Sequence, residues 1–152
     1  MNGLLFVHKR AFTMITRKDT PIVAFIDHLN TQKSLYEQIL ILSDRESGII
    51  KSKPFSMARV LEVLQTKNTL VTRIQVIEQQ LAEQRCQIDF NDISVSLKEE
   101  ISGLIQYIGS LLRKLLAQDS ANEEMLRECV CSGNKPTVNT HYAMKAYGAY
   151  AK

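Results

Sequence analysis

Turn-forming residues are scarce in this sequence of 152 residues. It contains three prolines and six glycines, and most of the segment between Thr20 and Cys131 contains neither. A strand-and-turn fold needs frequent turn residues, so this scarcity disfavours such a fold and favours long helices. The length fits one domain with a modest core, and a hydrophobic content of 45% is ordinary for a globular protein.

The sequence also lacks the motifs that carry catalysis. It contains no glycine-rich phosphate loop and no GxSxG pattern. The histidines lie far apart without the helical spacing of a zinc site, and glutamates that are adjacent on a helix point in different directions. We therefore expect no catalytic centre, no metal and no cofactor, and a solvated side chain at His28. The residues concerned are His8, His28, His141, Glu99, Glu100, Glu123 and Glu124.

Cysteine is too rare for a disulfide framework. The chain has three cysteines, Cys86, Cys129 and Cys131, and this odd number leaves one thiol without a partner. A Cys-x-Cys pair alone is a weak zinc signal, because structural zinc usually takes four ligands. Reduced thiols in a cytoplasmic protein are the expected state.

Charge of one sign and long apolar runs are missing as well. The net charge is +3, and lysines and arginines interleave with carboxylates, which argues against a nucleic-acid partner. No run approaches the roughly 18 apolar residues that a membrane helix needs, so we expect no stable membrane insertion. Residues 1–19 are basic, and we expect a flexible extension there. An organellar transit segment and a natural start at Met14 are the alternatives.

Apolar residues at helical spacing predict a first helix that begins at Thr20-Pro21, where threonine caps and proline fits the first turn. Gly48 is its expected end. A second helix is expected from Ser56, with Phe55 placed for a hydrophobic staple. Its apolar residues alternate three and four apart, which is typical of a coiled-coil seam. We expect Lys67 to set the register of this seam, with its stem packed and its amine in water. The seam consists of Val60, Val63, Lys67, Leu70, Ile74, Ile77 and Leu81.

A third helix is expected after a short polar link, with Ser96 and Glu99 matching a capping box. Its leucines and isoleucines fill an arc of roughly 140°, broad enough for two neighbours. Asp119 and Asn122 fall on this apolar face, which indicates either a solvent-exposed helix end or a device for specificity. The sequence thus predicts an all-α fold of three long antiparallel helices in a coiled-coil-like bundle over residues 20–131.

The last segment, residues 132–152, has a different composition. It contains Gly, Pro and Asn early and three of the five tyrosines of the chain, without a regular amphipathic pattern. We expect an irregular C-terminal tail. Tyrosine and methionine are common at binding surfaces, so this tail is either a contact surface or a segment that packs on its own bundle or stays disordered.

Several features of the second and third predicted helices occur in a familiar order. The second helix has a lysine followed by paired apolar residues and then a glutamate and an arginine, and the third has an asparagine ahead of an apolar pair, followed by a Tyr-Gly in the tail. From about residue 21 to the C-terminus, the chain resembles the flagellar export chaperones of the FlgN type. The matching residues are Lys67, Leu70, Val71, Ile77, Glu78, Arg85, Asn122, Met125, Leu126, Tyr147 and Gly148.

The resemblance implies a cytoplasmic chaperone of the flagellar type III export system rather than an enzyme. Such chaperones bind hook–filament junction proteins and prevent their premature assembly, and components of the export apparatus are further candidate partners. The resemblance places the cargo contact at the end of the third helix and in the tail. The alternative is a structural coiled-coil protein that dimerises through the seam, so a homodimer stays open. The residues carried over are Asn122, Met125, Leu126, Cys129, Tyr142 and Tyr147.

Overall fold

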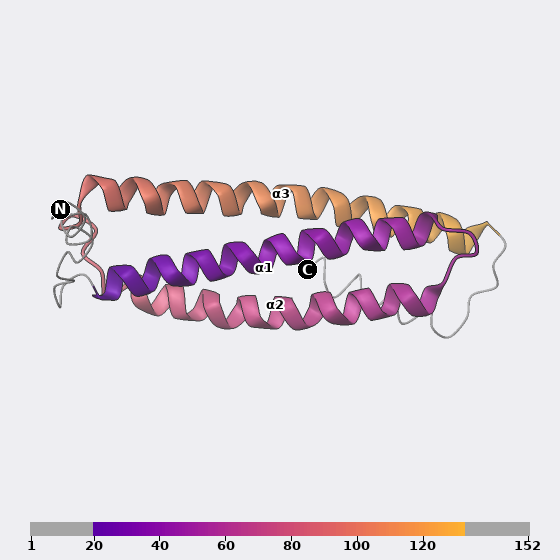
Figure 1. Ribbon diagram of the computed structural model, residues 1–152, viewed down its shortest axis with the longest axis horizontal. Coiled ribbons are helices and arrows are strands. Elements are labelled where there is room, and N and C mark those ends of the chain that lie inside the picture. Colours follow the sequence, from indigo (N-terminus) through magenta and orange to yellow (C-terminus); the bar gives the residue numbers. More distant parts are fainter. Residues whose placement is uncertain (1–19, 133–152) are drawn as a thin grey trace, which may run out of the picture.

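The computed structural model describes residues 20–132, and three helices account for most of them (Figure 1). They are α1 (Thr20–Lys51), α2 (Met57–Arg85) and α3 (Val95–Cys131). No strand occurs in this part of the chain. The predicted all-α bundle of three helices is therefore confirmed, whereas a coiled-coil geometry stays a prediction.

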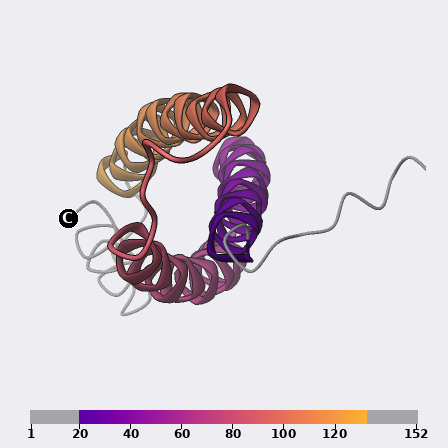
Figure 2. The ribbon, with the colours of Figure 1, turned by 90° about the vertical axis from the view of Figure 1, so that its left-hand side faces the viewer.

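Helix α1 lies between the other two helices and packs against both (Figure 1). Each helix runs back along the bundle relative to the one before it, so α1 and α3 point the same way. Seen from the end, the helices lie on an arc with α1 in the middle (Figure 2). Within residues 20–132 the backbones of α2 and α3 do not pack against each other, and only their side chains meet in the interior.

The apolar interior forms two clusters along the bundle. The larger cluster joins the first part of α1 to the second half of α2, the α2–α3 link and the first half of α3. The smaller cluster joins the end of α1 to the start of α2 and the end of α3, and its buried members are Ile49, Ile50, Val60, Val63, Leu64 and Leu126. The seam predicted for α2 is confirmed as an interior face, because five of its seven residues are buried and the other two pack against the larger cluster.

The predicted end of the first helix at Gly48 is wrong, because α1 continues to Lys51. The added turn places Ile49 and Ile50 in the smaller cluster, where both are buried. Burying two isoleucines gains about 3–6 kcal/mol, which exceeds the cost of about 1 kcal/mol for a glycine inside a helix. The predicted start of the second helix is confirmed, since the Ser56 hydroxyl caps α2 by accepting a hydrogen bond from the Arg59 amide.

The capping box predicted at Ser96 and Glu99 is wrong. Helix α3 begins two residues earlier, and its cap is Ser94, whose hydroxyl accepts a hydrogen bond from the Leu97 amide at 3.2 Å. The link before it is anchored by apolar residues, since Ile93 is buried immediately before the cap. This anchor fixes where the chain enters α3, so the cap falls on the first serine rather than the second.

None of the helices described between residues 20 and 132 combines the length and the apolar character that crossing a membrane requires.

Candidate functional site

A cluster of polar side chains is buried where the second half of α1, the first half of α2 and the last part of α3 meet. Apolar residues surround it, because it lies between the two apolar clusters of the bundle. We call it the polar cluster, and its members are Ser43, Glu46, Lys67, Asp119 and Asn122.

Lys67 is the only cation of the polar cluster, and its side chain is 0% exposed. Its Nζ lies 2.9 Å from Glu46 Oε2 on α1 and 2.6 Å from Asp119 Oδ1 on α3. One side chain of α2 therefore binds a carboxylate on each of the other two helices. The expectation that the amine of Lys67 reaches water is wrong, because both carboxylates meet it in the interior.

Asp119 and Asn122 are buried too, so the interpretation of a solvent-exposed helix end is wrong. The Ser43 hydroxyl donates to Asp119 Oδ1 at 2.6 Å. The Asn122 amide nitrogen donates to the Ser43 carbonyl at 2.8 Å and to Glu46 Oε2 at 3.4 Å. These bonds join α3 to α1 at one fixed register. A device for specificity, the other alternative, stays a prediction that fits this geometry.

The polar cluster has two carboxylates for one cation. Burial raises the pKa of Glu46, and the charge and hydrogen bond of Lys67 oppose this rise without cancelling it. Glu46 Oε1 and Asp119 Oδ2 are buried and have no hydrogen-bond partner among the described residues. The cluster can therefore take up a proton on Glu46, since protonation removes a costly buried charge. It cannot meet a substrate while the three helices stay packed.

Sequence reasoning missed Ser43 and Glu46. Both follow Ile39 on the interior face of α1 at spacings of four and seven residues, where further apolar residues would be expected. The available signal for these two residues was a polar pair on an otherwise apolar face of α1, similar to the polar pair already noted on α3. The pairing itself could not be read from the sequence, because it depends on how three helices meet.

A second polar contact joins α1 to the C-terminal half of α2. Glu78 Oε1 accepts hydrogen bonds from Gln32 at 3.3 Å and from the Tyr36 hydroxyl at 3.2 Å. Burial and the neighbouring Glu78 raise the pKa of Tyr36 to about 12. His28 Nδ1 lies 2.8 Å from Gln84 Oε1 and its side chain is half-buried, so the expected solvated histidine is instead part of the α1–α2 contact.

The residues predicted to bind cargo fall into three groups. Asn122 and Leu126 are fully buried between helices of their own chain. Met125 and Cys129 are half-buried beside the smaller apolar cluster at the same end of α3. Tyr142 and Tyr147 lie outside the described residues. Contact of these six with a cargo stays a prediction, and for Asn122 and Leu126 it requires the helices to separate.

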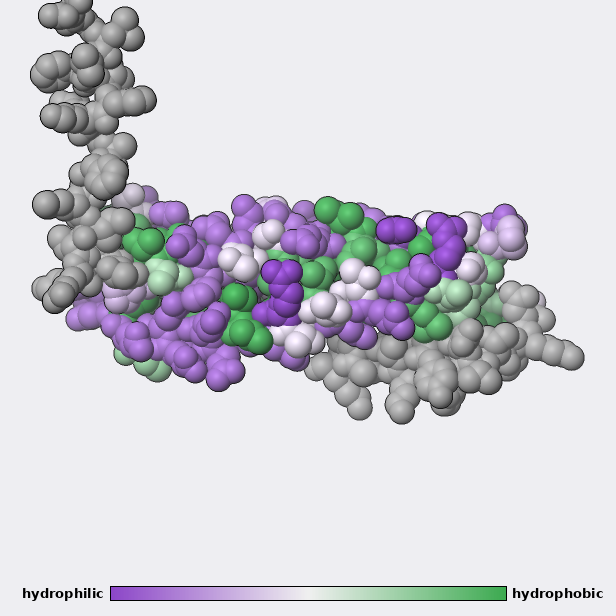
Figure 3. All heavy atoms as spheres, turned by 60° about the horizontal axis from the view of Figure 1, so that its bottom comes forward, coloured by the Kyte–Doolittle hydropathy of each residue, from purple (hydrophilic) through white to green (hydrophobic). Residues whose placement is uncertain are grey.

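An exposed apolar surface lies elsewhere on α3. Ile105 is 52% exposed, Leu116 is 61% exposed, and Leu112 between them is half-buried. Their spacing of seven and four residues places them on one side of the helix, and we call them the α3 stripe. On the face drawn in Figure 3, apolar side chains lie among hydrophilic ones. The broad apolar arc predicted for this helix included these residues without distinguishing them from the buried ones.

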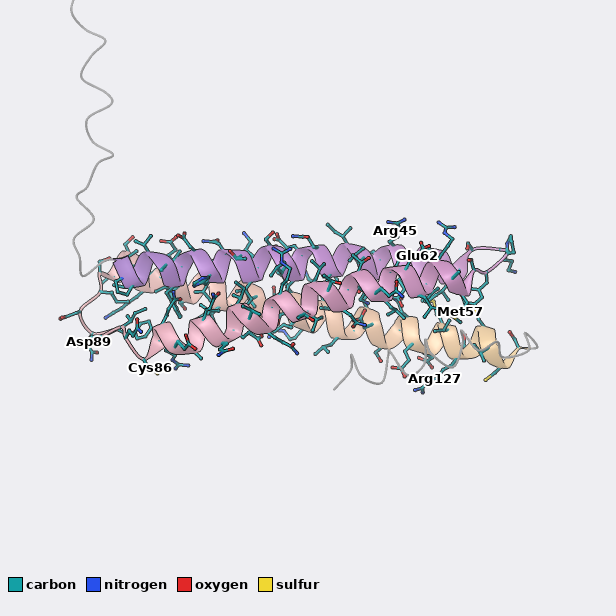
Figure 4. The ribbon with its side chains drawn as sticks, turned by 90° about the horizontal axis from the view of Figure 1, so that it is seen from below. Arg45, Met57, Glu62, Cys86, Asp89 and Arg127 are labelled. Atoms are coloured by element: carbon teal, nitrogen blue, oxygen red, sulfur yellow. The ribbon has the colours of Figure 1, made fainter. Side chains whose placement is uncertain are left out.

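The described residues offer no grouping of three or more His, Cys, Asp or Glu side chains suited to a metal ion. All three cysteines are free, and Cys86 lies at the opposite end of the bundle from the end of α3 that carries Cys129 and Cys131 (Figure 4). The features that the structure defines are thus a polar cluster inside a three-helix bundle and an apolar stripe outside it. Comparison with models of protein families, with curated proteins and with solved structures found no match for the chain.

Proposed function

We propose that this protein binds helical segments of other proteins and acts as a cytoplasmic chaperone of flagellar type III export. In this proposal its cargo is a hook–filament junction protein, which it keeps from assembling before export. The α3 stripe carries the proposal, because it is an apolar face at helical spacing that no other helix of the described chain covers. The order of sequence features that resembles the FlgN type supplies the class of cargo.

The α3 stripe suits a partner helix. A helix whose apolar residues recur at i, i+4 and i+7 can lie along Ile105, Leu112 and Leu116 and extend the arc of three helices to a fourth. Covering the exposed parts of Ile105 and Leu116 contributes about 2–3 kcal/mol. This contribution is too small for tight binding alone, so the proposal requires further contacts beyond the stripe.

A structural protein that dimerises through the α2 seam has less support. The seam residues from Val60 to Ile74 are buried against the other helices of the same chain. Dimerisation through them would require α2 to leave α1 and to expose the apolar clusters. A partner on the α3 stripe requires no such change, which favours the chaperone over the dimer.

The test is capture of a purified hook–filament junction protein encoded in the same genome. The variant Ile105→Asp/Leu116→Asp places two charges on the α3 stripe, and we expect it to lose capture while its circular dichroism stays helical. Ile41→Asp is the matched control, because Ile41 is 67% exposed on α1. The proposal predicts unchanged capture for this control and weaker capture after deletion of the chain beyond Ser132. Full capture by the double variant would rule out the stripe as the contact surface.

A further inference from the structure

A groove lies at the end of the bundle where α1 begins, α2 ends and α3 begins. Its floor consists of Phe25 of α1, Phe90 of the α2–α3 link and Ile101 of α3. The two phenylalanine rings meet edge to face with centroids 6.0 Å apart, so the floor is a packed apolar surface. We call this feature the end groove. Its volume is about 640 Å³, and the first residue of the α3 stripe, Ile105, forms part of its rim.

The rim of the end groove is cationic. Arg85 from the end of α2 and Lys98 from the start of α3 line it, and no acidic residue of the described part of the chain does. Both cations are exposed, and neither forms an ion pair with a carboxylate of the described residues. Glu99 and Glu100 follow Lys98 directly but do not line the groove. An apolar floor between these two exposed cations fits a ligand that is apolar on one side and negatively charged at its edges.

The shape of the end groove distinguishes a peptide from a small molecule. Sites for small molecules typically enclose most of the ligand surface. Five of the eight residues that line this groove are exposed, so it is a surface trough rather than an enclosed site. Its α3 wall runs from Lys98 to Gln106, which corresponds to about 12 Å or two helical turns. That length matches apolar residues of a partner helix at positions i, i+4 and i+7.

Charge also distinguishes an external partner from the N-terminal segment of the same chain. Helix α1 begins at this end of the bundle, and residues 1–19, which precede it in the sequence, include apolar residues. However, they contain four lysines and arginines against one aspartate, so their net charge has the same sign as the rim. A basic segment beside Arg85 and Lys98 is disfavoured, and an acidic one is attracted.

We propose that the end groove binds an acidic amphipathic helix of the cargo, with apolar side chains on Phe25, Phe90 and Ile101 and carboxylates beside Arg85 and Lys98. The inference rests on the proposed function in one respect, namely that the bound helix belongs to the cargo. The inference specifies the chemistry of this cargo helix, which is acidic and amphipathic. It also places the contact of the cargo helix at the opposite end of α3 from the residues that the resemblance indicates. Cys86 and Asp89 mark this end of the bundle in Figure 4.

The experiment measures binding of a synthetic fluorescent peptide to the full-length chain by anisotropy. The peptide has about 14 residues, or four helical turns, with leucines at i, i+3, i+4 and i+7 and glutamates on the other positions. One control peptide has lysines in place of the glutamates, and another has the acidic composition in scrambled order. We expect only the ordered acidic peptide to bind, and we expect its affinity to fall as salt rises.

Matched variants locate the contact. Arg85→Gln/Lys98→Gln should weaken the acidic peptide roughly three- to tenfold at low salt, with a smaller loss at high salt. Its control is Arg45→Gln/Arg59→Gln, which removes two exposed arginines at the other end of the bundle (Figure 4) and should leave binding unchanged. Ile105→Ser should weaken binding about fivefold, whereas Ile41→Ser should not change it.

Three results would overturn the inference. The first is equal binding by the groove variants and the wild type, and the second is equal binding of the basic and acidic peptides. The third is an increase in acidic-peptide affinity when residues 1–19 are deleted, because those residues would then be the natural occupant. A different result would contradict the proposed function without contradicting the end groove. If the peptide binds with the expected pattern but no hook–filament junction protein is captured, the groove stands and the flagellar cargo is wrong.

Discussion

Removing the buried cation of the polar cluster is the sharpest test of how this bundle is stabilised. Lys67→Met retains most of the apolar stem and removes the amine that contacts Glu46 at 2.9 Å and Asp119 at 2.6 Å. Two buried carboxylates then face each other without a compensating charge. Removing one partner of a buried ion pair typically costs 3–5 kcal/mol. Relative to a total stability of about 5–15 kcal/mol, this is a large part of the folding free energy.

The assay is urea denaturation followed by circular dichroism, with Lys114→Met as the control for the exposed surface of α3. We expect the control to lie within about 0.5 kcal/mol of the wild type and Lys67→Met to fall about 3–5 kcal/mol below it. The deficit should shrink as pH falls, because protonation removes the unpaired charges. A Lys67→Met variant within about 1 kcal/mol of the wild type at neutral pH would refute the buried geometry of the cluster.

Three further predictions follow from burial and helix propensity. Because burial raises the pKa of Glu46, the stabilisation that this group provides below its unfolded pKa, near 4.5, is lost as pH rises through the folded value. The stability of Glu46→Gln relative to the wild type should therefore increase between pH 4.5 and neutral pH in a denaturation series. Gly48→Ala and Gly103→Ala should each raise the unfolding free energy by about 0.5–1 kcal/mol, since a Cβ meets open space at both helical positions. Leu126→Ala should cost about 2–5 kcal/mol, and Leu116→Ala under about 1 kcal/mol, because the first leucine is fully buried and the second largely exposed; equal thermal shifts for the two variants would contradict this placement.

The helices could be predicted from the sequence because their signals are local. Scarce glycine and proline, apolar spacing and the cap at Ser56 depend only on neighbours along the chain, and the structure agrees with each of them. The two errors in helix ends have a non-local cause. Gly48 does not end α1 because Ile49 and Ile50 gain more from packing against other helices than the glycine costs.

The polar cluster could be predicted only in fragments. Lys67, Asp119 and Asn122 each stand out as polar residues on an apolar face, and that pattern alone leaves open whether they reach water. Their burial depends on which residues of α1 face them, and Ser43 and Glu46 are separated from Asp119 by more than 70 residues. Sequence spacing along one helix carries no information about that pairing. The α3 stripe could not be predicted for the same reason. The sequence predicts the apolar arc of α3 but does not reveal which side of that arc the neighbouring helices leave exposed.

Burying the charged groups of the polar cluster costs desolvation free energy that apolar residues would not cost. We therefore infer that the cluster serves to fix which residues of the three helices meet. Replacing it with apolar residues, as in Glu46→Leu/Lys67→Met/Asp119→Leu, removes every buried charge together, and such replacements are often neutral or stabilising by about 1–4 kcal/mol. Asn122 retains its bond to the Ser43 carbonyl, and the Ser43 hydroxyl can donate to the preceding turn of α1. We therefore expect the triple variant to resist urea at least as well as the wild type. With apolar residues in register along all three helices, it should also form alternative registers or oligomers, which sedimentation and the number of amide NMR signals would reveal. A stable monomer with a single set of signals would show that apolar packing alone determines the register, and that the cluster needs another explanation.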